Sequence, residues 1–504
     1  MKISRRRAVG LMLFAPWAAA AQDSVVAPDT RRRGNRPPGN RGPGGPQHNP
    51  DQKKASTFYT DVPAHDFDII LGRPTADAIT ASVLSYAEIE GFFSYGSDPS
   101  KLDQESAPQR FRAGEPVEVV LTKLRPNQAY SYCFNWRRAG ATDYTADGPR
   151  RFQTQRSRGS EFTFTVQADS HLDDPQAASL YTNTLRAVQA DAPDFHIDLG
   201  DTFMTDKRGQ QFATAQSQYL AQRYYLGLVG HSAPVFLVLG NHDGETGSRF
   251  YGKGDSMPGW SNAMRRRYFP NPLPNGFYTG NNMPTDPLGL LQDYYSWEWG
   301  NALSVVLDPY WFTTSRSKGP AAFWERSLGE TQYRWLESTL AKSNAPFRFV
   351  FIHNLVGGGD EAMRGGAEAA RFFEWGGRNL DGTPEFAQHR PGWPAPIHDV
   401  LKKYGVSVVF HGHDHFFARQ ELDGIVYQLV PQPATPGGRN VTRMVSEYGY
   451  VSGDFLPSPG YLWVSVGNSE THVVFKNTSS EKAEQAFEYR IPSSQRNMGS
   501  AGKK

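Results

Sequence analysis

The sequence lacks several features that would narrow its class at once. Its 504 residues include one cysteine, Cys133, so no disulfide can form within the chain, and cysteine usage leaves the redox compartment undetermined. No apolar stretch is long enough to span a bilayer as a permanent helix, which argues against a transmembrane anchor. The net charge is also small, at +2.

That small net charge is unevenly distributed. Residues 1–54 contain 11 basic and three acidic side chains, a net charge of +8, so the remainder of the chain carries −6. Because the body of the protein is mildly acidic, we expect no nucleic-acid-binding surface on it. A chain of this length is expected to form two domains with terminal tails.

The first 21 residues have the pattern of a signal peptide. The basic segment Lys2–Arg7 precedes a short, moderately apolar stretch, Ala8–Trp17, and Ala19-Ala20-Ala21 supplies small residues for cleavage. Ser4-Arg5-Arg6 resembles the start of a twin-arginine signal. We therefore expect residues 1–21 to direct export, to the periplasm or the extracellular space, by the twin-arginine route.

Residues 22–55 have the composition of a disordered linker. Arg, Gly, Pro and Asn dominate, as in Arg31-Arg32-Arg33-Gly34-Asn35. Such a segment cannot bury enough apolar surface to offset the entropy lost on ordering. Its positive charge leaves a second interpretation open, which is adhesion to anionic surface polymers.

Residues 56–156 consist of short strands separated by turns. Ala78–Leu84 and Tyr130–Trp136 alternate between apolar and polar residues, and the second places all its aromatic side chains on one face. In Leu124–Tyr130, a Leu, a Pro and a Tyr that opens a strand resemble the tyrosine corner of β-sandwiches. We expect an all-β domain that resembles a fibronectin type III sandwich.

From residue 160 to residue 478, longer apolar strands alternate with helical stretches, which predicts an α/β domain. Residues 479–504 are expected to be a C-terminal tail. Five of the apolar strands end in polar residues that can bind metals, and in chain order these ends are Asp169-Ser170-His171, Gly200-Asp201, Gly240-Asn241-His242-Asp243, His353 and Gly412-His413-Asp414-His415.

Strand ends of this kind are where open α/β sheets collect their ligands. Residues two apart in an extended segment face the same way, so Asp169 with His171, and His413 with His415, can each present two ligands to one pocket. Each motif alone has a simpler explanation, such as a loop aspartate or a solvated histidine. Five such ends in one chain indicate a shared site.

The ordered set Asp-x-His, Gly-Asp, Gly-Asn-His-Asp, His and Gly-His-x-His resembles the calcineurin-like metallophosphoesterase superfamily, over roughly residues 160–430. The resemblance implies a four-layer α/β-sandwich that binds two metal ions and hydrolyses phosphoesters by attack of a hydroxide bridging them. By resemblance, Asp201 bridges the two ions. The first ion would be bound by Asp169, His171 and His415, and the second by Asn241, His353 and His413.

The ligand types also bear on the ions and the substrate. Mixed imidazole and carboxylate ligands suit Fe, Zn or Mn better than Mg alone. Two divalent ions, two carboxylates and a bridging hydroxide leave a charge of about +1 at the mouth of the site, which suits a phosphate substrate.

His242 follows the predicted ligand Asn241, and in this family that position is not a ligand. The resemblance implies that His242 is the general acid or leaving-group stabiliser. Asp243 is predicted as a second catalytic residue that orients His242, with a plain turn carboxylate as an equal alternative. His411 and Asp198 are expected to support the ligands or the core. His196, inside a strand, is expected to be a core histidine.

Two positions depart from the purple acid phosphatases, which also carry a fibronectin type III-like domain before the catalytic domain. Their first motif has Gly where this chain has His171, and their second supplies a Tyr ligand where this chain has Met204. We therefore expect the iron–tyrosinate colour to be absent.

Two long segments outside the motifs, Gly247–Leu291 and Gly357–Pro394, have the composition of loops that flank a site. Arginines within them, including Arg364, Arg371 and Arg390, could clamp phosphate oxygens, and solvated surface is the alternative.

Together these patterns predict an exported, two-domain phosphoric ester hydrolase with a dinuclear metal centre. Its substrate would be a small-molecule or polymer-linked phosphoester, and monoesters and diesters are equally compatible with the sequence. The alternative is a surface binding or adhesion protein that uses the β-sandwich and the basic tail and carries a vestigial phosphoesterase domain.

Overall fold

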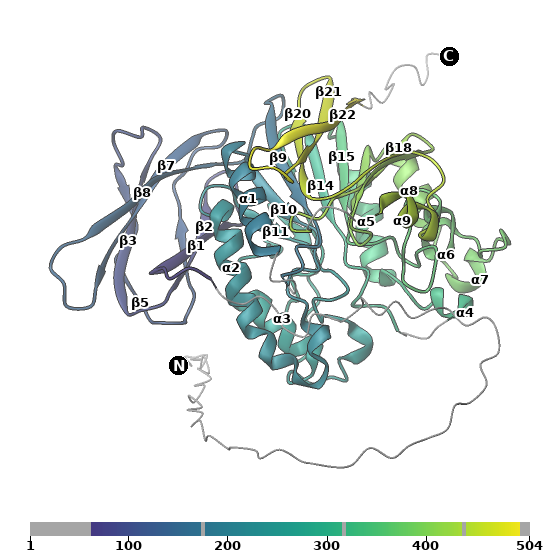
Figure 1. Ribbon diagram of the computed structural model, residues 1–504, viewed down its shortest axis with the longest axis horizontal. Coiled ribbons are helices and arrows are strands. Elements are labelled where there is room, and N and C mark those ends of the chain that lie inside the picture. Colours follow the sequence, from purple (N-terminus) through teal and green to yellow (C-terminus); the bar gives the residue numbers. More distant parts are fainter. Residues whose placement is uncertain (1–61, 173–176, 315–318, 436–439, 494–504) are drawn as a thin grey trace, which may run out of the picture. The chain divides into compact units, whose positions relative to one another are not determined.

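A computed structural model describes residues 62–172, 177–314, 319–435 and 440–493 (Figure 1). The predicted signal peptide and linker lie outside the described residues. The described chain forms an all-β region followed by a mixed α/β domain, which confirms the predicted fold class.

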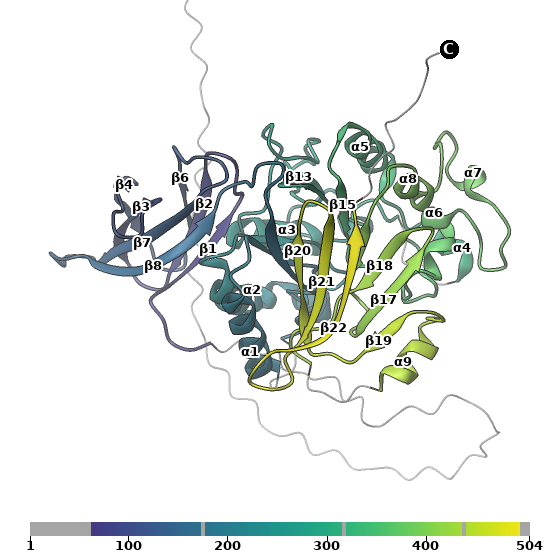
Figure 2. The same ribbon diagram turned by 90° about the horizontal axis from the view of Figure 1, so that it is seen from above.

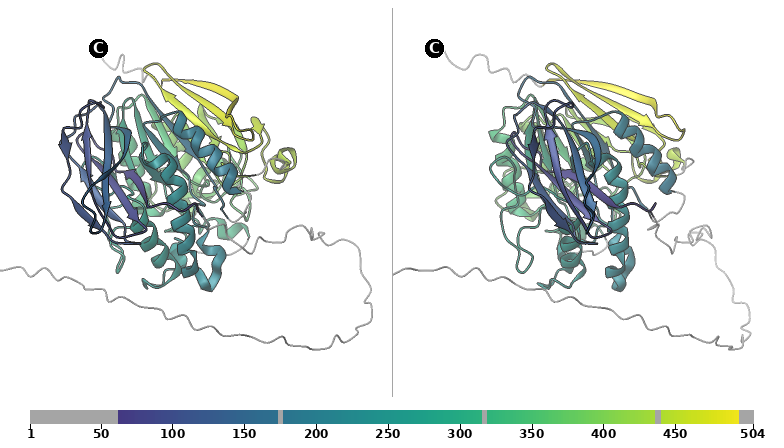
Figure 3. Two further views of the ribbon diagram at one scale, coloured as in Figure 1. Left: turned by 60° about the vertical axis from the view of Figure 1, so that its left-hand side comes forward. Right: turned by 90° about the vertical axis from the view of Figure 1, so that its left-hand side faces the viewer.

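The all-β region is a sandwich of two antiparallel sheets, drawn in purple and blue in Figure 3. One sheet has the strand order β1-β2-β6, and the other has the order β4-β3-β7-β8 with β5 paired to β3. The strands are Phe67–Gly72 (β1), Ile79–Ser85 (β2), Ile89–Gly96 (β3), Gln104–Glu105 (β4), Gln109–Phe111 (β5), Val117–Leu121 (β6), Ala129–Arg138 (β7) and Thr145–Gln153 (β8).

The aromatic face of β7 builds the core of this sandwich. Tyr130, Tyr132 and Phe134 are buried there, as their alternation predicts. The backbone N–H of Arg125 donates to the Tyr130 hydroxyl at 2.9 Å. This bond closes the predicted tyrosine corner and fixes the turn that leads into β7.

The α/β domain is built on two mixed sheets. The six-stranded sheet has the order β11-β10-β9-β20-β21-β22, with β9, β10 and β11 parallel and the last three strands antiparallel. Its strands are Phe162–Gln167 (β9), Phe195–Asp198 (β10), Val235–Leu237 (β11), Gly460–Val466 (β20), Glu470–Asn477 (β21) and Glu484–Pro492 (β22).

The second sheet has eight strands in the order β12-β13-β14-β15-β16-β18-β17-β19, and β14, β15, β16 and β18 run parallel. The strands are Thr279–Gly280 (β12), Tyr295–Trp299 (β13), Ala302–Val306 (β14), Phe347–Phe351 (β15), Val408–His411 (β16), Phe417–Leu422 (β17), Ile425–Leu429 (β18) and Asp454–Leu456 (β19).

The two sheets pack face to face and helices cover their outer faces, which gives the four layers. Between the sheets, the ring of Phe164 on β9 lies 5.7 Å from that of Phe349 and 6.2 Å from that of Phe410. Helices α1 (Ala177–Ala190) and α2 (Gln216–Gly230) cover the six-stranded sheet. Helices α5 (Gly329–Lys342) and α8 (Ile397–Lys403) cover the eight-stranded sheet.

Short helices occupy the connections. They are η1 (Thr205–Ala215), η2 (Gly247–Arg249), α3 (Met257–Tyr268), α4 (Pro320–Phe323), η3 (Ala369–Arg371), α6 (Phe373–Gly376), α7 (Phe386–His389) and α9 (Val441–Glu447). In the described ranges, no helix combines the length and the apolar character needed to cross a membrane.

The six-stranded sheet continues into the segment predicted to be a tail. Strand β22 pairs with β21 and lies beside it in Figure 2. Its side chains alternate, and Phe487, Tyr489 and Ile491 pack against the core between the sheets. This period of two was visible in the sequence, so placing the start of the tail at residue 479 was wrong.

The first long segment expected to be a loop contains α3. Ser256 caps this helix by accepting from the Gly259 N–H, and Pro258 stands in the first turn, where a missing N–H costs nothing. The helix packs against α2, whose buried Arg223 donates to the carbonyls of Tyr268 and Ser82. Arg223 thus connects the α/β domain to strand β2 of the sandwich.

Candidate metal centre

The loops that follow β9, β10, β15 and β16 bring six of the seven predicted ligands into two compact groups. Within each group, one ligand atom from every residue lies within 4.8 Å of the others. The groups are Asp169, His171 and His415, and Asp201, His353 and His413. These are the two ion sites that the family resemblance implied, with Asp201 counted in the second.

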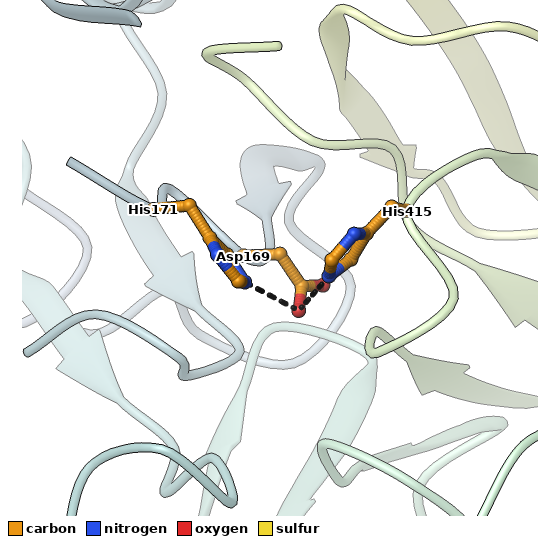
Figure 4. Close-up of side chains that lie close together, drawn as sticks. All are labelled: Asp169, His171 and His415. Carbon is orange, nitrogen blue, oxygen red and sulfur yellow. Dashed lines mark ion pairs between the residues drawn. The ribbon is translucent and has the colours of Figure 1, made fainter. Parts of the chain in front are cut away.

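The first group is centred on the buried Asp169. Its Oδ1 lies 3.2 Å from Nε2 of His415 and 3.7 Å from Nε2 of His171. Figure 4 shows the two imidazoles approaching this carboxylate from opposite sides. One oxygen and two ring nitrogens therefore face a common point.

The second group lies directly beside the first, and Asp201 stands between them. Its Oδ2 is 3.3 Å from Nε2 of His353 in the second group and 3.7 Å from Nε2 of His171 in the first. Oδ2 of Asp201 therefore approaches ligand atoms of both groups. Asn241, the seventh predicted ligand, offers a buried Oδ1 that accepts no hydrogen bond among the described residues.

The ligand atoms face inward because the other polar atoms of the same side chains are already bound. Oδ2 of Asp169 accepts from the backbone N–H of His413, and Oδ1 of Asp201 accepts from that of His242, both at 2.8 Å. These bonds leave Oδ1 of Asp169 and Oδ2 of Asp201 for the site.

Two of the four imidazoles follow the same rule. His353 donates from Nδ1 to the Leu199 carbonyl at 2.8 Å, and His413 donates from Nε2 to the Ala362 carbonyl at 2.6 Å. Their opposite nitrogens are buried and have no hydrogen-bond partner in the described chain. Metal-binding histidines characteristically donate their second N–H in this way, so the residues present fit a pair of ions.

Electrostatics favour cations in both groups. Burial raises the pKa of the Asp169 carboxyl, but the imidazoles of His415 and His353 outweigh it and hold that pKa well below its usual range. Burial lowers the pKa of His353, yet the Asp201 and Asp169 carboxylates raise it to about 10. Burial and the neighbouring His353 lower the pKa of His413 to about 3, which keeps this ring in its neutral, ligating form.

Five of the seven predicted ligands lie in the left-handed region of the backbone, which is uncommon for residues with side chains. They are Asp169 (φ 60°), His171 (φ 43°), Asp201 (φ 56°), His413 (φ 79°) and His415 (φ 67°). Each such residue costs of order 1–3 kcal/mol, and strain of this kind clusters at functional sites. The surrounding loops must therefore hold these residues in place.

Asp243 is one of the residues that hold them. Its carboxylate accepts the backbone N–H groups of Gly240, Asp201, Thr202 and Phe203, at 2.7–3.1 Å. The two loops touch so closely that a Cβ on Gly240 would lie 2.0 Å from the Asp201 nitrogen. The predicted orienting role of Asp243 is therefore not the one seen, and its hydrogen bonds match the turn-carboxylate alternative.

The residue that orients His242 is Asp206. Its Oδ1 accepts from Nδ1 of His242 at 2.8 Å, and the imidazole remains about 30% exposed at the mouth of the site. Sequence reasoning missed Asp206 because it lies in η1, five residues after Asp201. The one signal available was a carboxylate in the loop that follows the Gly-Asp strand end.

The three residues predicted to support the ligands or the core are all buried. Asp198 is buried and accepts from Gln167, Gly200 and Thr202 at 2.6–3.0 Å, so it shapes the loop that carries Asp201. His196 lies in the core, 2.8 Å from the Thr165 hydroxyl, as expected. His411 is also buried, and burial lowers its pKa to about 4.

Two arginines of the flanking segments are internal supports rather than candidates for substrate binding. Arg265 forms a fully buried ion pair with Glu245. Arg390 is bonded to the buried carboxylate of Glu374 and to the carbonyls of Trp324 and Arg326. Arg364 differs from both, because its guanidinium reaches the Gly412–His415 turn.

Comparison with known proteins agrees with this geometry. Residues 162–417, slightly more than half of the chain, match the family pattern of the calcineurin-like phosphoesterases. No curated protein matches the chain. The chain is similar to the solved structure of PhoD, at 14% identity and a TM-score of 0.58, over 84% of this chain and 89% of that one.

It is also similar to the purple acid phosphatase PPD1 from yellow lupin (Lupinus luteus) seeds, at 16% identity and a TM-score of 0.52, over 84% of this chain and 74% of that one. Coverage of 84% exceeds the α/β domain, so the likeness in fold extends into the N-terminal sandwich. The chain belongs to the calcineurin-like phosphoesterase family, and it is a phosphoric ester hydrolase.

Proposed function

We propose that this protein is an exported dinuclear-metal phosphoesterase that hydrolyses phosphate mono- or diesters. The observation that carries the proposal is the pair of adjacent groups around Asp169 and Asp201. In each of these carboxylates one oxygen accepts a backbone N–H, whereas the other faces the imidazole nitrogens of the groups. A set built for binding alone would not need a histidine at its mouth.

The donor types support Fe, Zn or Mn as the ions. When bound, such a pair would polarise the phosphoryl group and supply a nucleophilic water at neutral pH. The chain itself contributes position and a proton. His242 is held by Asp206 through Nδ1 and is about 30% exposed, which leaves Nε2 to protonate or stabilise the leaving oxygen.

Export rests on the N-terminal sequence, with its basic segment, short apolar stretch and small residues before position 22. We place the enzyme in the periplasm or outside the cell. There, a substrate could be either a small phosphoester or a phosphoester linked to a polymer.

A hydrolysis screen tests the proposal. The purified protein is reconstituted with Fe, Zn or Mn and assayed on phosphomonoesters, phosphodiesters and nucleotides. The matched control is Asp201→Ala, which removes the side chain shared by both groups. We expect turnover by the wild type and its loss, together with metal, in the variant. A protein that binds two ions per chain and hydrolyses none of these esters would support the adhesion alternative.

A further inference from the structure

A glycine-rich loop, residues 357–366, is fastened to the second metal group. The carbonyl of Ala362 accepts from Nε2 of His413 at 2.6 Å. The N–H of Gly365 donates to Oδ2 of Asp414 at 2.9 Å. Because Asp414 stands between His413 and His415, which belong to different groups, this loop lies against the turn that serves both.

The loop is shaped from within and supported from behind. Inside it, the N–H of Gly359 donates to the Arg364 carbonyl at 2.7 Å, and the Arg364 N–H donates to Oδ1 of Asp360 at 2.9 Å. Behind it, the guanidinium of Arg326 donates to the carbonyls of Gly357, Asp360 and Glu361. These hydrogen bonds fix the loop, and therefore fix the backbone position of Arg364.

The guanidinium of Arg364 is fixed in two ways. Nη1 donates to Oδ1 of Asp414 at 3.3 Å, and Cζ lies 3.9 Å from the centre of the Tyr448 ring. Stacking on the ring sets the plane of the guanidinium, and Asp414 sets its rotation. A side chain held in this way loses little entropy when it binds a ligand.

One edge of this guanidinium remains unused. Neither Nε nor Nη2 of Arg364 has a hydrogen bond with any described residue, whereas Arg326 and Arg390 are each bonded to several internal acceptors. The Arg364 side chain is 26% exposed, and its partner Asp414 is only 2% exposed. The single bond to Asp414, at 3.3 Å, is also longer than the roughly 2.7–2.9 Å of a strong charge-assisted bond.

We propose that Arg364 binds the non-bridging phosphoryl oxygens of the substrate through its unused edge, and that it selects dianionic monoesters over monoanionic diesters. This inference rests on the proposed function of the same site. A centre with a charge of about +1 balances a diester monoanion but leaves a monoester dianion with excess negative charge. A planar fork that donates two parallel N–H groups suits that additional oxygen.

The test compares Arg364→Gln and Arg364→Lys with Arg371→Gln. Arg371, seven residues further along in η3, is exposed as the solvated-surface alternative expected, and it is the matched control. The substrates are a phosphomonoester and a methyl phosphodiester with the same aryl leaving group. Metal content is measured for every protein, and the affinity for inorganic phosphate is measured by calorimetry.

For Arg364→Gln we expect kcat/KM on the monoester to fall about 10²-fold, and on the diester about threefold or less. Phosphate affinity should fall with monoester activity. Arg364→Lys should show an intermediate loss, because an ammonium cannot contact two oxygens as a planar fork. Arg371→Gln should match the wild type.

Equal losses on both esters, or no loss on either, would overturn the inference. If Arg364→Gln binds less metal than the wild type, Arg364→Lys, which keeps the charge beside Asp414, carries the comparison instead. If the wild type hydrolyses neither ester, the proposed function fails. Phosphate binding then decides the role of Arg364, which is refuted if Arg364→Gln and Arg371→Gln bind phosphate equally.

Discussion

The backbone N–H of His413 donates a hydrogen bond of 2.8 Å to Oδ2 of Asp169. The first residue follows β16 of the eight-stranded sheet, and the second follows β9 of the six-stranded sheet. One carboxylate therefore joins the ends of the two sheets while its Oδ1 faces the first metal group. The structural role and the metal-binding role of Asp169 belong to different oxygens, so mutations can separate them.

Asp169→Asn should lose metal but keep the hydrogen bond from the His413 N–H, which tethers the two sheets. The amide oxygen can still accept from His413, which places the NH₂ group, a donor that cannot ligate, at the metal. Asp169→Ala should lose both, because the buried N–H of His413 is left without an acceptor, at a cost of about 1–3 kcal/mol. Metal analysis and thermal melting of the metal-free proteins test this. Equal melting temperatures for the two variants would show that the tether contributes nothing.

His242 should act on the leaving group and not on metal binding. His242→Ala should keep both ions and slow hydrolysis by roughly 10²–10⁴. An alkyl phosphate should lose most, and a substrate with an acidic phenol should lose least, because that leaving group needs little protonation. Rates on both substrates, with metal content verified, are the measurement. An equal loss on both would remove His242 from this role.

Asp206→Asn should reproduce part of the His242→Ala defect, because Asp206 only orients the ring. In a His242→Ala background the same change should have no further effect, since residues that act as one unit are not additive. If the two rate losses multiply in the double variant, Asp206 acts on the reaction independently of His242.

The as-isolated protein should lack a strong visible charge-transfer band. Met204, which by resemblance stands where the purple acid phosphatases supply tyrosinate, is buried. The hydroxyl of Tyr310, which lies near the carboxylates of the site, donates to Oδ1 of Asn354 and is thus engaged. Absorption spectra of the iron-loaded protein test this, and a band lost in Tyr310→Phe would identify Tyr310 as a recruited ligand.

The strand ends were predictable because each combines a local apolar run with a polar turn, as Phe162–Val166 does before Asp169. The fold class followed from the same runs. Strand β22 was missed although Phe487, Tyr489 and Ile491 alternate, because the surrounding residues are polar and a strand at a sheet edge needs only one buried face.

The hydrogen bond between Asp206 and His242 could not be predicted from the sequence, for a different reason. It arises only when the loops after β10 and β11 are placed side by side, and the two positions, 36 residues apart in the sequence, give no sign of this. The left-handed backbone conformation of Asp169 and His415 could not be predicted either, because neither Asp nor His is specific for positive φ. The Asp414–Arg364–Tyr448 arrangement likewise depends on three separate segments.

The final prediction concerns acid stability and His196, which lies on β10, five residues before Asp201. Its buried ring is bonded to Thr165, and burial lowers its pKa to about 3. An unfolded histidine has a pKa of about 6.5. At pH values between these two pKa values, the unfolded chain binds a proton at His196 and the folded chain does not. The free energy of unfolding therefore falls as the pH drops from about 6.5 toward 3, by up to about 1.4 kcal/mol per pH unit.

His196→Asn removes this titration and retains a polar group that can bond to the Thr165 hydroxyl. The variant should be less stable than the wild type at pH 7, because it loses packing in the core. Between pH 6.5 and pH 5, however, it should lose about 1.7 kcal/mol less than the wild type. Chemical denaturation at both pH values gives the four free energies. Taking the difference between the two proteins cancels the titration of the metal groups, so parallel pH dependences would show that His196 is protonated equally in the folded and unfolded chains.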